Sequence, residues 1–147
     1  MNQTNDKQKA EQYRQAAEQG DAEAIVVAEA IAVQRFRKAA EQGQGWGQYN
    51  LGECYLKGTC VSKDEAEAVK WFRKAAEQDD SYAGFAQYEL GRCYIYGWGV
   101  PQDIIEAEKW LRAAAQTRRA QSRYGEKIDM ILTVIELMRK EKPENKQ

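Results

Sequence analysis

The sequence repeats itself. Residues 47–78 align with residues 86–117 without a gap, at an offset of 39 positions, and 16 of the 32 aligned pairs are identical. A period of about 20–50 residues is typical of proteins in which similar units stack and each unit buries its apolar face against the next. We therefore expect the chain to fold as a short stack of similar units.

Each repeat unit is expected to contain two helices. In the second half of the unit, apolar residues fall at positions i, i+3, i+4, i+7 and i+8, which places them on one face of a helix. The first half carries a shorter stripe of the same kind. Only Pro101 and Pro143 interrupt a sequence rich in helix-forming residues, so the fold class is predicted to be all-α. The apolar positions are Leu51, Cys54, Tyr55, Ala68, Trp71, Phe72, Ala75 and Ala76 in one unit and Leu90, Cys93, Tyr94, Ala107, Trp110, Leu111, Ala114 and Ala115 in the next.

Glycine and aspartate mark the turn between the two helices of each unit. Gly58 and Gly97 stand where the first helix is expected to end, and Asp64 and Asp103 stand where the second begins. A glutamate follows each aspartate after three positions, which resembles a helix capping box. These carboxylates are therefore explained as helix starts and not as a catalytic acid–base pair.

Gly52 and Gly91 lie inside the first helix of each unit. Glycine in a helix costs about 1 kcal/mol relative to alanine, so we expect the second helix to approach closely there as compensation. The facing residues are predicted to be Ala68 or Ala75 in one unit and Ala107 or Ala114 in the other.

Composition excludes several functional classes. Histidine is absent, which removes the commonest general base and metal ligand, and the three cysteines include no CxxC pair. A net charge of −1 gives no general attraction to nucleic acid or to an anionic membrane. No window approaches the ~20 apolar residues that span a bilayer, and no secretory signal begins the sequence. We therefore predict a cytoplasmic protein with no catalytic residue, metal site, cofactor, nucleic-acid partner or membrane partner.

The repeated residues resemble the Sel-one-like repeat family, which is related to the tetratricopeptide repeat. The resemblance implies a short right-handed α-solenoid, or α–α superhelix, of antiparallel helix pairs that holds peptides or protein surfaces in a concave groove. It implies no shared active site. The matching positions are Leu51, Gly52, Tyr55, Gly58, Val61, Asp64, Ala68, Trp71, Ala75 and Ala76 in one unit and Leu90, Gly91, Tyr94, Gly97, Gly99, Val100, Asp103, Ala107, Trp110, Ala114 and Ala115 in the other.

The ends of the chain depart from the repeat, although residues 1–147 are expected to form one domain. The predicted parts are an atypical N-terminal capping unit at 5–42, complete repeats at 47–85 and 86–117, a C-terminal capping helix at 120–141 and a disordered tail at 142–147. Glycines 43, 45 and 47 are interpreted as the connection between the N-terminal unit and the first complete repeat.

Both capping segments are predicted to be long helices. Residues 21–42 contain no Gly or Pro and lack the turn of a complete unit, which predicts one uninterrupted helix. Arg35 stands where the complete units have tryptophan, so this helix is expected to expose that face to water. At the other end an apolar stripe is expected to cover the last repeat. Its members are Ile128, Ile131, Leu132, Ile135 and Met138.

The exposed side of the first helices is the predicted binding surface, because these helices line the inner curve of such solenoids. Ordinary solvated side chains are an equal alternative for these positions. Trp98, in the turn of the second unit, is either packed on neighbouring apolar surface, which we favour, or presented to a partner. The candidate partner-binding residues are Asn50, Glu53, Lys57, Glu89, Arg92, Tyr96 and Trp98.

A basic cluster and the cysteines are further candidate sites. The basic residues at the junction before the last helix suit a phosphate contact. The alternative, which we favour, is that Arg118 and Arg119 follow a helix C-terminus, where the helix dipole favours cations. Cys54 and Cys93 are expected to be buried, whereas Cys60 in the loop is a candidate for a bridge or a reactive thiol. The basic residues are Arg118, Arg119, Arg123 and Lys127.

The pattern favours a protein-interaction scaffold or adaptor that binds a partner protein or peptide through its concave surface. An inhibitor or immunity-type protein that occludes a single partner is the alternative. A hydrolase has the weakest support because no nucleophile and base are evident, and a structural homo-oligomer is a further class, with the oligomeric state left open.

Overall fold

The computed structural model describes residues 3–141, and within that range the chain forms seven α-helices and no β-strand. None of the helices in this range combines the length and the apolar character needed to cross a membrane. The helices are α1 (Gln3–Glu18), α2 (Ala22–Glu41), α3 (Gly45–Lys57), α4 (Glu65–Ala76), α5 (Ala83–Tyr96), α6 (Ile104–Ala115) and α7 (Arg118–Glu141).

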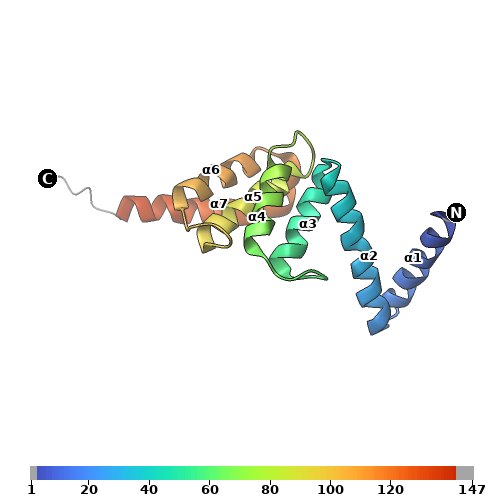
Figure 1. The fold of residues 1–147 in the computed structure, drawn as a ribbon. Coiled ribbons are helices and arrows are strands. Elements are labelled where there is room, and N and C mark those ends of the chain that lie inside the picture. The colour runs from blue at the N-terminus through green and yellow to red at the C-terminus, as the bar shows by residue number, and fades with distance from the viewer. Residues whose placement is uncertain (1–2, 142–147) are drawn as a thin grey trace.

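The repeat units are two stacked helical hairpins, α3 with α4 and α5 with α6 (Figure 1). α4 contacts α5, and α7 packs on α6 and α5. The residues that the apolar periodicity selects form the core, because Ala68, Phe72, Leu90 and Leu111 are 0% exposed and Ile128 of α7 is equally buried. The predicted all-α solenoid of helix pairs is therefore confirmed.

The turns form as the glycines and aspartates predict. Gly58 and Gly97 adopt left-handed φ angles of 73° and 72°, and each N–H donates to a carbonyl of the preceding helix. The carboxylate of Asp64 accepts the N–H of Glu67, and Asp103 does the same in α6. The capping box is only half formed, however, because the carboxylate of each following glutamate pairs with a lysine three residues later on its own helix.

Gly52 and Gly91 mark close contact between the helices of a hairpin, as expected, but the partners differ from the prediction. A Cβ on Gly52 would lie 2.7 Å from Cε1 of Phe72, and a Cβ on Gly91 would lie 2.6 Å from Cγ of Leu111. Ala107 contributes only its backbone oxygen, at 3.4 Å from the Gly91 position. Glycine at these two positions makes room for a large side chain of the second helix. The prediction that alanines face the glycines was wrong.

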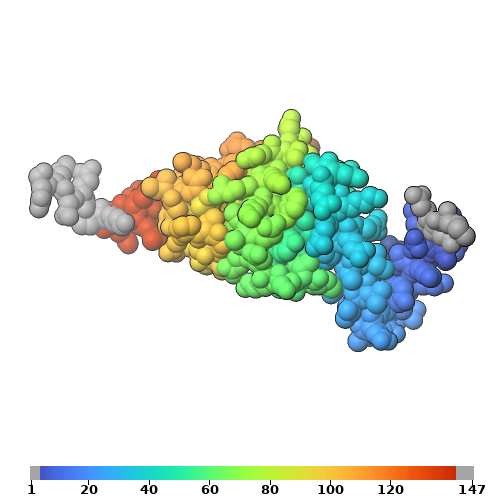
Figure 2. Space-filling model, viewed as in Figure 1, coloured from blue at the N-terminus to red at the C-terminus, as the bar shows by residue number. Residues whose placement is uncertain are grey.

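The N-terminal part is an arm made of α1 and α2. α2 is one uninterrupted helix, as the absence of Gly and Pro predicts, and its N-cap Asp21 accepts the N–H of Ala24. α1 packs on α2, and α2 packs on α3. Arg35 is exposed, as expected for a terminal unit. Figure 2 shows this arm projecting from the body formed by α3 to α7.

The glycines after α2 do not all lie in a connection. Gly43 does, with a φ of 79°, but Gly45 and Gly47 belong to the first turn of α3. A Cβ on Gly47 would lie 2.5 Å from Cβ of Ala39, so its missing side chain allows α3 to approach α2 closely. The prediction of a glycine-rich loop at all three positions was therefore wrong.

α7 covers the last hairpin with only part of its predicted stripe. Ile128 and Ile135 are buried, and Ile131 and Leu132 are partly buried against the core. Met138, in contrast, is 52% exposed, because α7 has 24 residues against 12 in α6 and extends beyond it. The predicted tail at 142–147 lies outside the described residues.

A carboxylate on α6 anchors the end of α7. Glu108 accepts a hydrogen bond from Nε of Arg112 at 2.9 Å and forms an ion pair with Arg139 of α7. Hydrogen bonding from Arg112 lowers the pKa of Glu108, so the carboxylate stays charged at neutral pH. Nothing in the repeat alignment indicated this contact.

Candidate functional site

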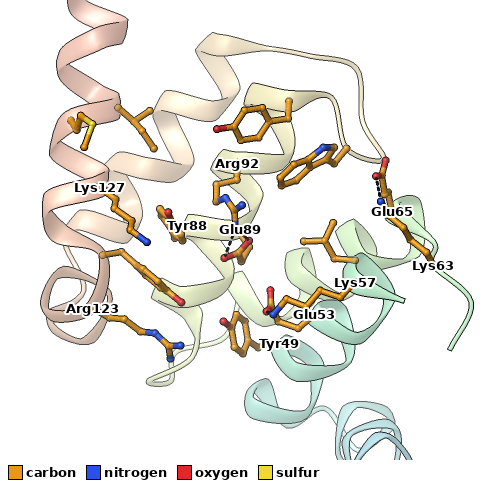
Figure 3. Close-up of a pocket in the computed structure, with 16 residues that line it drawn as sticks. Tyr49, Glu53, Lys57, Lys63, Glu65, Tyr88, Glu89, Arg92, Arg123 and Lys127 are labelled. Carbon is orange, nitrogen blue, oxygen red and sulfur yellow. Dashed lines mark hydrogen bonds and ion pairs between the residues drawn. The ribbon is translucent and has the colours of Figure 1, made fainter. Parts of the chain in front are cut away.

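The first helices of the two hairpins and α7 enclose a groove of about 680 Å³. Figure 3 shows side chains from all three helices pointing into it. Of the seven predicted binding residues, Asn50 alone does not line this groove. It lines a neighbouring depression of about 340 Å³, which shares Tyr49, Glu53, Lys57 and Arg123 with the groove. The predicted residues in the groove are Glu53, Lys57, Glu89, Arg92, Tyr96 and Trp98.

Glu89 forms the floor of the groove and is not the exposed residue that we expected. It is 4% exposed, because α5 lies between α3 and α7 and is covered from both sides. Its Oε2 pairs with Nη1 of Arg92 at 3.0 Å. Burial raises the pKa of Glu89 to about 7, although the charge of Arg92 acts in the opposite direction.

Two further ion pairs lie on the wall of the groove near α3. Lys57 pairs with Glu53 one turn earlier on α3, and this hydrogen bond raises the pKa of Lys57. Lys63 pairs with Glu65 at 3.2 Å in the segment that leads into α4. Both lysines keep more than half of their side-chain surface exposed, so their methylene groups and ammonium groups remain accessible from the groove.

Trp98 packs on the protein and also lines the groove. Its ring stacks on Tyr96 with centroids 4.7 Å apart, and the guanidinium carbon of Arg92 lies 5.1 Å from its centroid. Trp98 is also packed against the core cluster, which confirms the favoured interpretation. The indole therefore forms a fixed apolar wall above the Glu89–Arg92 pair.

The sequence did not reveal the aromatic side of the groove. Tyr88 of α5 stacks on Tyr124 of α7, with centroids 4.2 Å apart and an angle of 12° between the planes. Tyr49 of α3 lies beside them in the lining. Burial raises the pKa of Tyr49 and Tyr88, and a hydrogen bond with Tyr124 contributes to the shift at Tyr49, so both hydroxyl groups stay protonated.

The basic cluster is divided between the start of α7 and the groove. Arg118 and Arg119 follow the C-terminus of α6 at Ala115, as expected, and they also form the first turn of α7. Arg123 and Lys127 lie one and two turns further on and line the groove. The sequence does carry a signal for this. When residues 120–128 are laid over residues 86–94, Gly125 falls at the position of Gly91, which makes α7 the equivalent of a first helix and therefore of a groove wall.

The cysteines form no disulfide bridge. Cys54 and Cys93 are buried free thiols, as predicted, and burial raises the pKa of Cys93 to about 12. Cys60 is exposed and free, so the alternative of a bridge to Cys54 was wrong. Among residues 3–141, no cluster of three or more cysteine or carboxylate side chains is placed to hold a metal ion.

Stacked helical hairpins whose first helices share one groove define a short α-solenoid repeat protein. A family model for the Sel1 repeat matches residues 5–21, 32–44, 47–80 and 84–116. The chain belongs to the Sel1 repeat family, as its resemblance to Sel-one-like repeats predicted. Proteins of this family are generally protein-interaction scaffolds, and the fold is typically not enzymatic.

Two solved structures show the same fold. A protective antigen of uropathogenic Escherichia coli that displays an SLR fold is 36% identical, with a TM-score of 0.65 over 91% of this chain. A Sel1 repeat protein from Oxalobacter formigenes is 47% identical, with a TM-score of 0.54 over 60% of this chain. The matches cover 30% and 35% of those two chains, so this chain is similar to about a third of each. No curated protein sequence matches it.

Proposed function

We propose that this chain is an adaptor that holds a segment of a partner protein in the groove between α3, α5 and α7. The observation that carries the proposal is the convergence of side chains from three separate helices on one groove of about 680 Å³. Each wall belongs to a different unit of the stack, so a bound segment would contact both repeats and the capping helix at once. Such shared surfaces are how solenoids bind extended partners.

The chemistry of the lining suits a peptide. Trp98 and Tyr96 offer a flat aromatic surface for an apolar side chain, and aromatic residues are enriched among the residues that dominate binding energy. Tyrosine hydroxyls and charged groups lie beside this surface and supply hydrogen-bonding partners for a peptide backbone. An apolar wall beside polar groups is the usual composition of a protein interface.

Peptide selection tests the proposal. A random library of 12-residue peptides displayed on phage is selected on the intact chain, and the selected peptides are synthesised with a fluorescent label. Their affinities are then measured by fluorescence polarisation against a groove variant, Tyr96→Ala with Lys57→Ala. Both side chains are largely exposed, so the variant is expected to fold. We expect its affinity for the selected peptides to fall about tenfold or more.

The control variant removes the same two residue types away from the groove. Tyr13 lies on α1 and Lys70 on α4, and both are exposed and absent from the lining. Tyr13→Ala with Lys70→Ala is expected to bind the peptides as the unmodified chain does. If no peptide is selected, or if every peptide binds both variants equally, the groove is not the binding site.

A further inference from the structure

The charges in the groove are unbalanced. Five basic and three acidic side chains line it. Glu53, Glu65 and Glu89 each pair with one basic residue of the groove, through Lys57, Lys63 and Arg92 respectively. Arg123 and Lys127, the two remaining cations, form no ion pair with any side chain in residues 3–141. The groove therefore has a local excess of positive charge in a chain whose net charge is −1.

Aromatic rings, and not a carboxylate, hold Arg123 in place. Its guanidinium carbon lies 5.4 Å from the ring centroid of Phe85 and 5.2 Å from that of Tyr124. A guanidinium stacked on rings keeps its N–H donors free for an acceptor. Figure 3 shows Arg123 and Lys127 extending from neighbouring turns of α7 towards the groove. These two cations are adjacent on α7, and no ion pair within residues 3–141 neutralises either of them.

A carboxylate on a peptide matches this arrangement better than a nucleic acid does. Arg123 presents a planar fork that suits a carboxylate, and Lys127 adds a second positive charge one turn away. A continuous chain of phosphates would also meet the carboxylates of Glu53 and Glu89, which lie in the same groove. A short acidic segment places its charge at α7 and avoids these glutamates.

We propose that the partner segment is acidic, with an Asp or Glu side chain bound by Arg123 and Lys127 and an apolar side chain packed on Tyr96 and Trp98. This inference rests on the proposed function, because it describes what the groove between α3, α5 and α7 selects. The charge selects the partner's acidic side chain, and the aromatic wall fixes the position of the neighbouring residue.

The test compares peptide selection on three proteins. The unmodified chain is expected to enrich Asp and Glu among the peptides that depend on the groove, and their affinity is expected to fall as NaCl is raised from about 50 to 500 mM. Arg123→Glu with Lys127→Glu is expected to weaken these peptides by about tenfold or more and to enrich Lys and Arg in a new selection. Arg37→Glu with Lys38→Glu makes the same charge change on exposed residues of α2 outside the groove and is expected to leave both results unchanged.

The outcomes separate the two proposals. Groove-dependent peptides that are neutral or basic overturn the acidic segment and leave the adaptor function standing. The absence of any groove-dependent peptide overturns both. Displacement of the peptides by the single-stranded oligonucleotide dT12, lost in the Arg123 and Lys127 variant, assigns these cations to phosphate and overturns the acidic segment. If the charge-reversed variant fails to fold by circular dichroism, Arg123→Gln with Lys127→Gln and the salt dependence of the unmodified chain decide the question.

Discussion

Glu89 accepts a hydrogen bond from Nη1 of Arg92 at 3.0 Å under the groove, with only 5% of its side chain exposed to solvent. Two opposing effects act on this carboxylate, because burial penalises its charge and the guanidinium favours it. Burial is the larger effect, and the pKa rises to about 7. The floor of the groove therefore changes charge near neutral pH.

We predict that Glu89 makes the fold less stable as the pH rises from about 4.5 to 7. Its pKa is higher in the folded chain than its ordinary value of 4.5, so the folded state holds the proton more tightly in this interval. The contribution of the protonated form is complete below pH 4.5 and is lost by about pH 7, with a size of roughly 3 kcal/mol at most. Thermal unfolding at a series of pH values measures it.

Glu89→Gln is the informative variant for this prediction. The amide keeps the shape of the side chain but does not titrate. We therefore expect the melting temperature of the unmodified chain to fall relative to that of the variant as the pH rises. Glu126→Gln changes an exposed carboxylate on α7 and serves as the control. Melting profiles of Glu89→Gln that run parallel to those of the unmodified chain at every pH would contradict the assignment.

Gly52→Ala is expected to destabilise the fold by about 1–3 kcal/mol. The new Cβ would lie 2.7 Å from Cε1 of Phe72, a fully buried ring that cannot move aside without disturbing the core. The matched control is Gly125→Ala in α7, where the nearest atom is the side-chain end of Gln121 at 2.8 Å, which is free to rotate away. Alanine there is expected to be neutral or to stabilise by up to about 1 kcal/mol. Urea unfolding of both variants measures the change in the free energy of unfolding. Equal changes for Gly52→Ala and Gly125→Ala would contradict the packing argument.

Glu108→Gln is expected to loosen α7 from α6. It weakens the hydrogen bonds from Arg112 and Arg139, of which the second joins α6 to the end of α7. The pKa of Glu108 is lowered in the folded state, so its contribution is present at neutral pH and disappears as the pH falls through that lowered pKa. Hydrogen exchange of the amides in 130–141 measures the loosening. Protection that is unchanged in the variant would show that the pair does not anchor α7.

Trp98→Ala is expected to weaken a groove-binding peptide by about tenfold to a hundredfold, because the indole forms the apolar wall of the groove. Trp98→Phe keeps an aromatic ring against Tyr96 and is expected to lose less peptide affinity than Trp98→Ala. Trp46→Ala removes an indole that packs on Phe36 outside the groove and is the control. Fluorescence polarisation with peptides from the selection gives the affinities, and equal affinities for Trp98→Ala and Trp46→Ala would remove Trp98 from the site.

The helices of the repeats could be predicted because local chemistry defines them. Gly58 can end a helix in the left-handed region and Asp64 can begin one, whatever lies around them. The partner of Gly52 could not be predicted in the same way. It depends on how α3 crosses α4, and a period of 3.6 residues places Ala68, Phe72 and Ala75 on the same face without saying which of them lies opposite the glycine.

The groove could be predicted only on the α3 and α5 sides. Glu53, Lys57, Arg92 and Tyr96 followed from their places on the first helices of the repeats. Arg123 could not be placed in the groove, because α7 lacks the loop that marks a repeat and its basic residues also suit a helix terminus. The burial of Glu89 is a consequence of two neighbouring helices, which the pattern of one helix does not contain.

The three walls of the groove belong to three successive units of the stack, and α5 lies between the outer two and packs on both α3 and α7. The distance between these walls is therefore set by the pitch of the superhelix, through the layers of side chains that separate one hairpin from the next. Within each hairpin, Phe72 sets how closely α4 approaches α3 at Gly52, and Leu111 sets how closely α6 approaches α5 at Gly91. We expect a change in the volume of either side chain to move the helices of its hairpin and, with them, the walls of the groove. Under the proposed function, the buried core would then influence which partner segment fits.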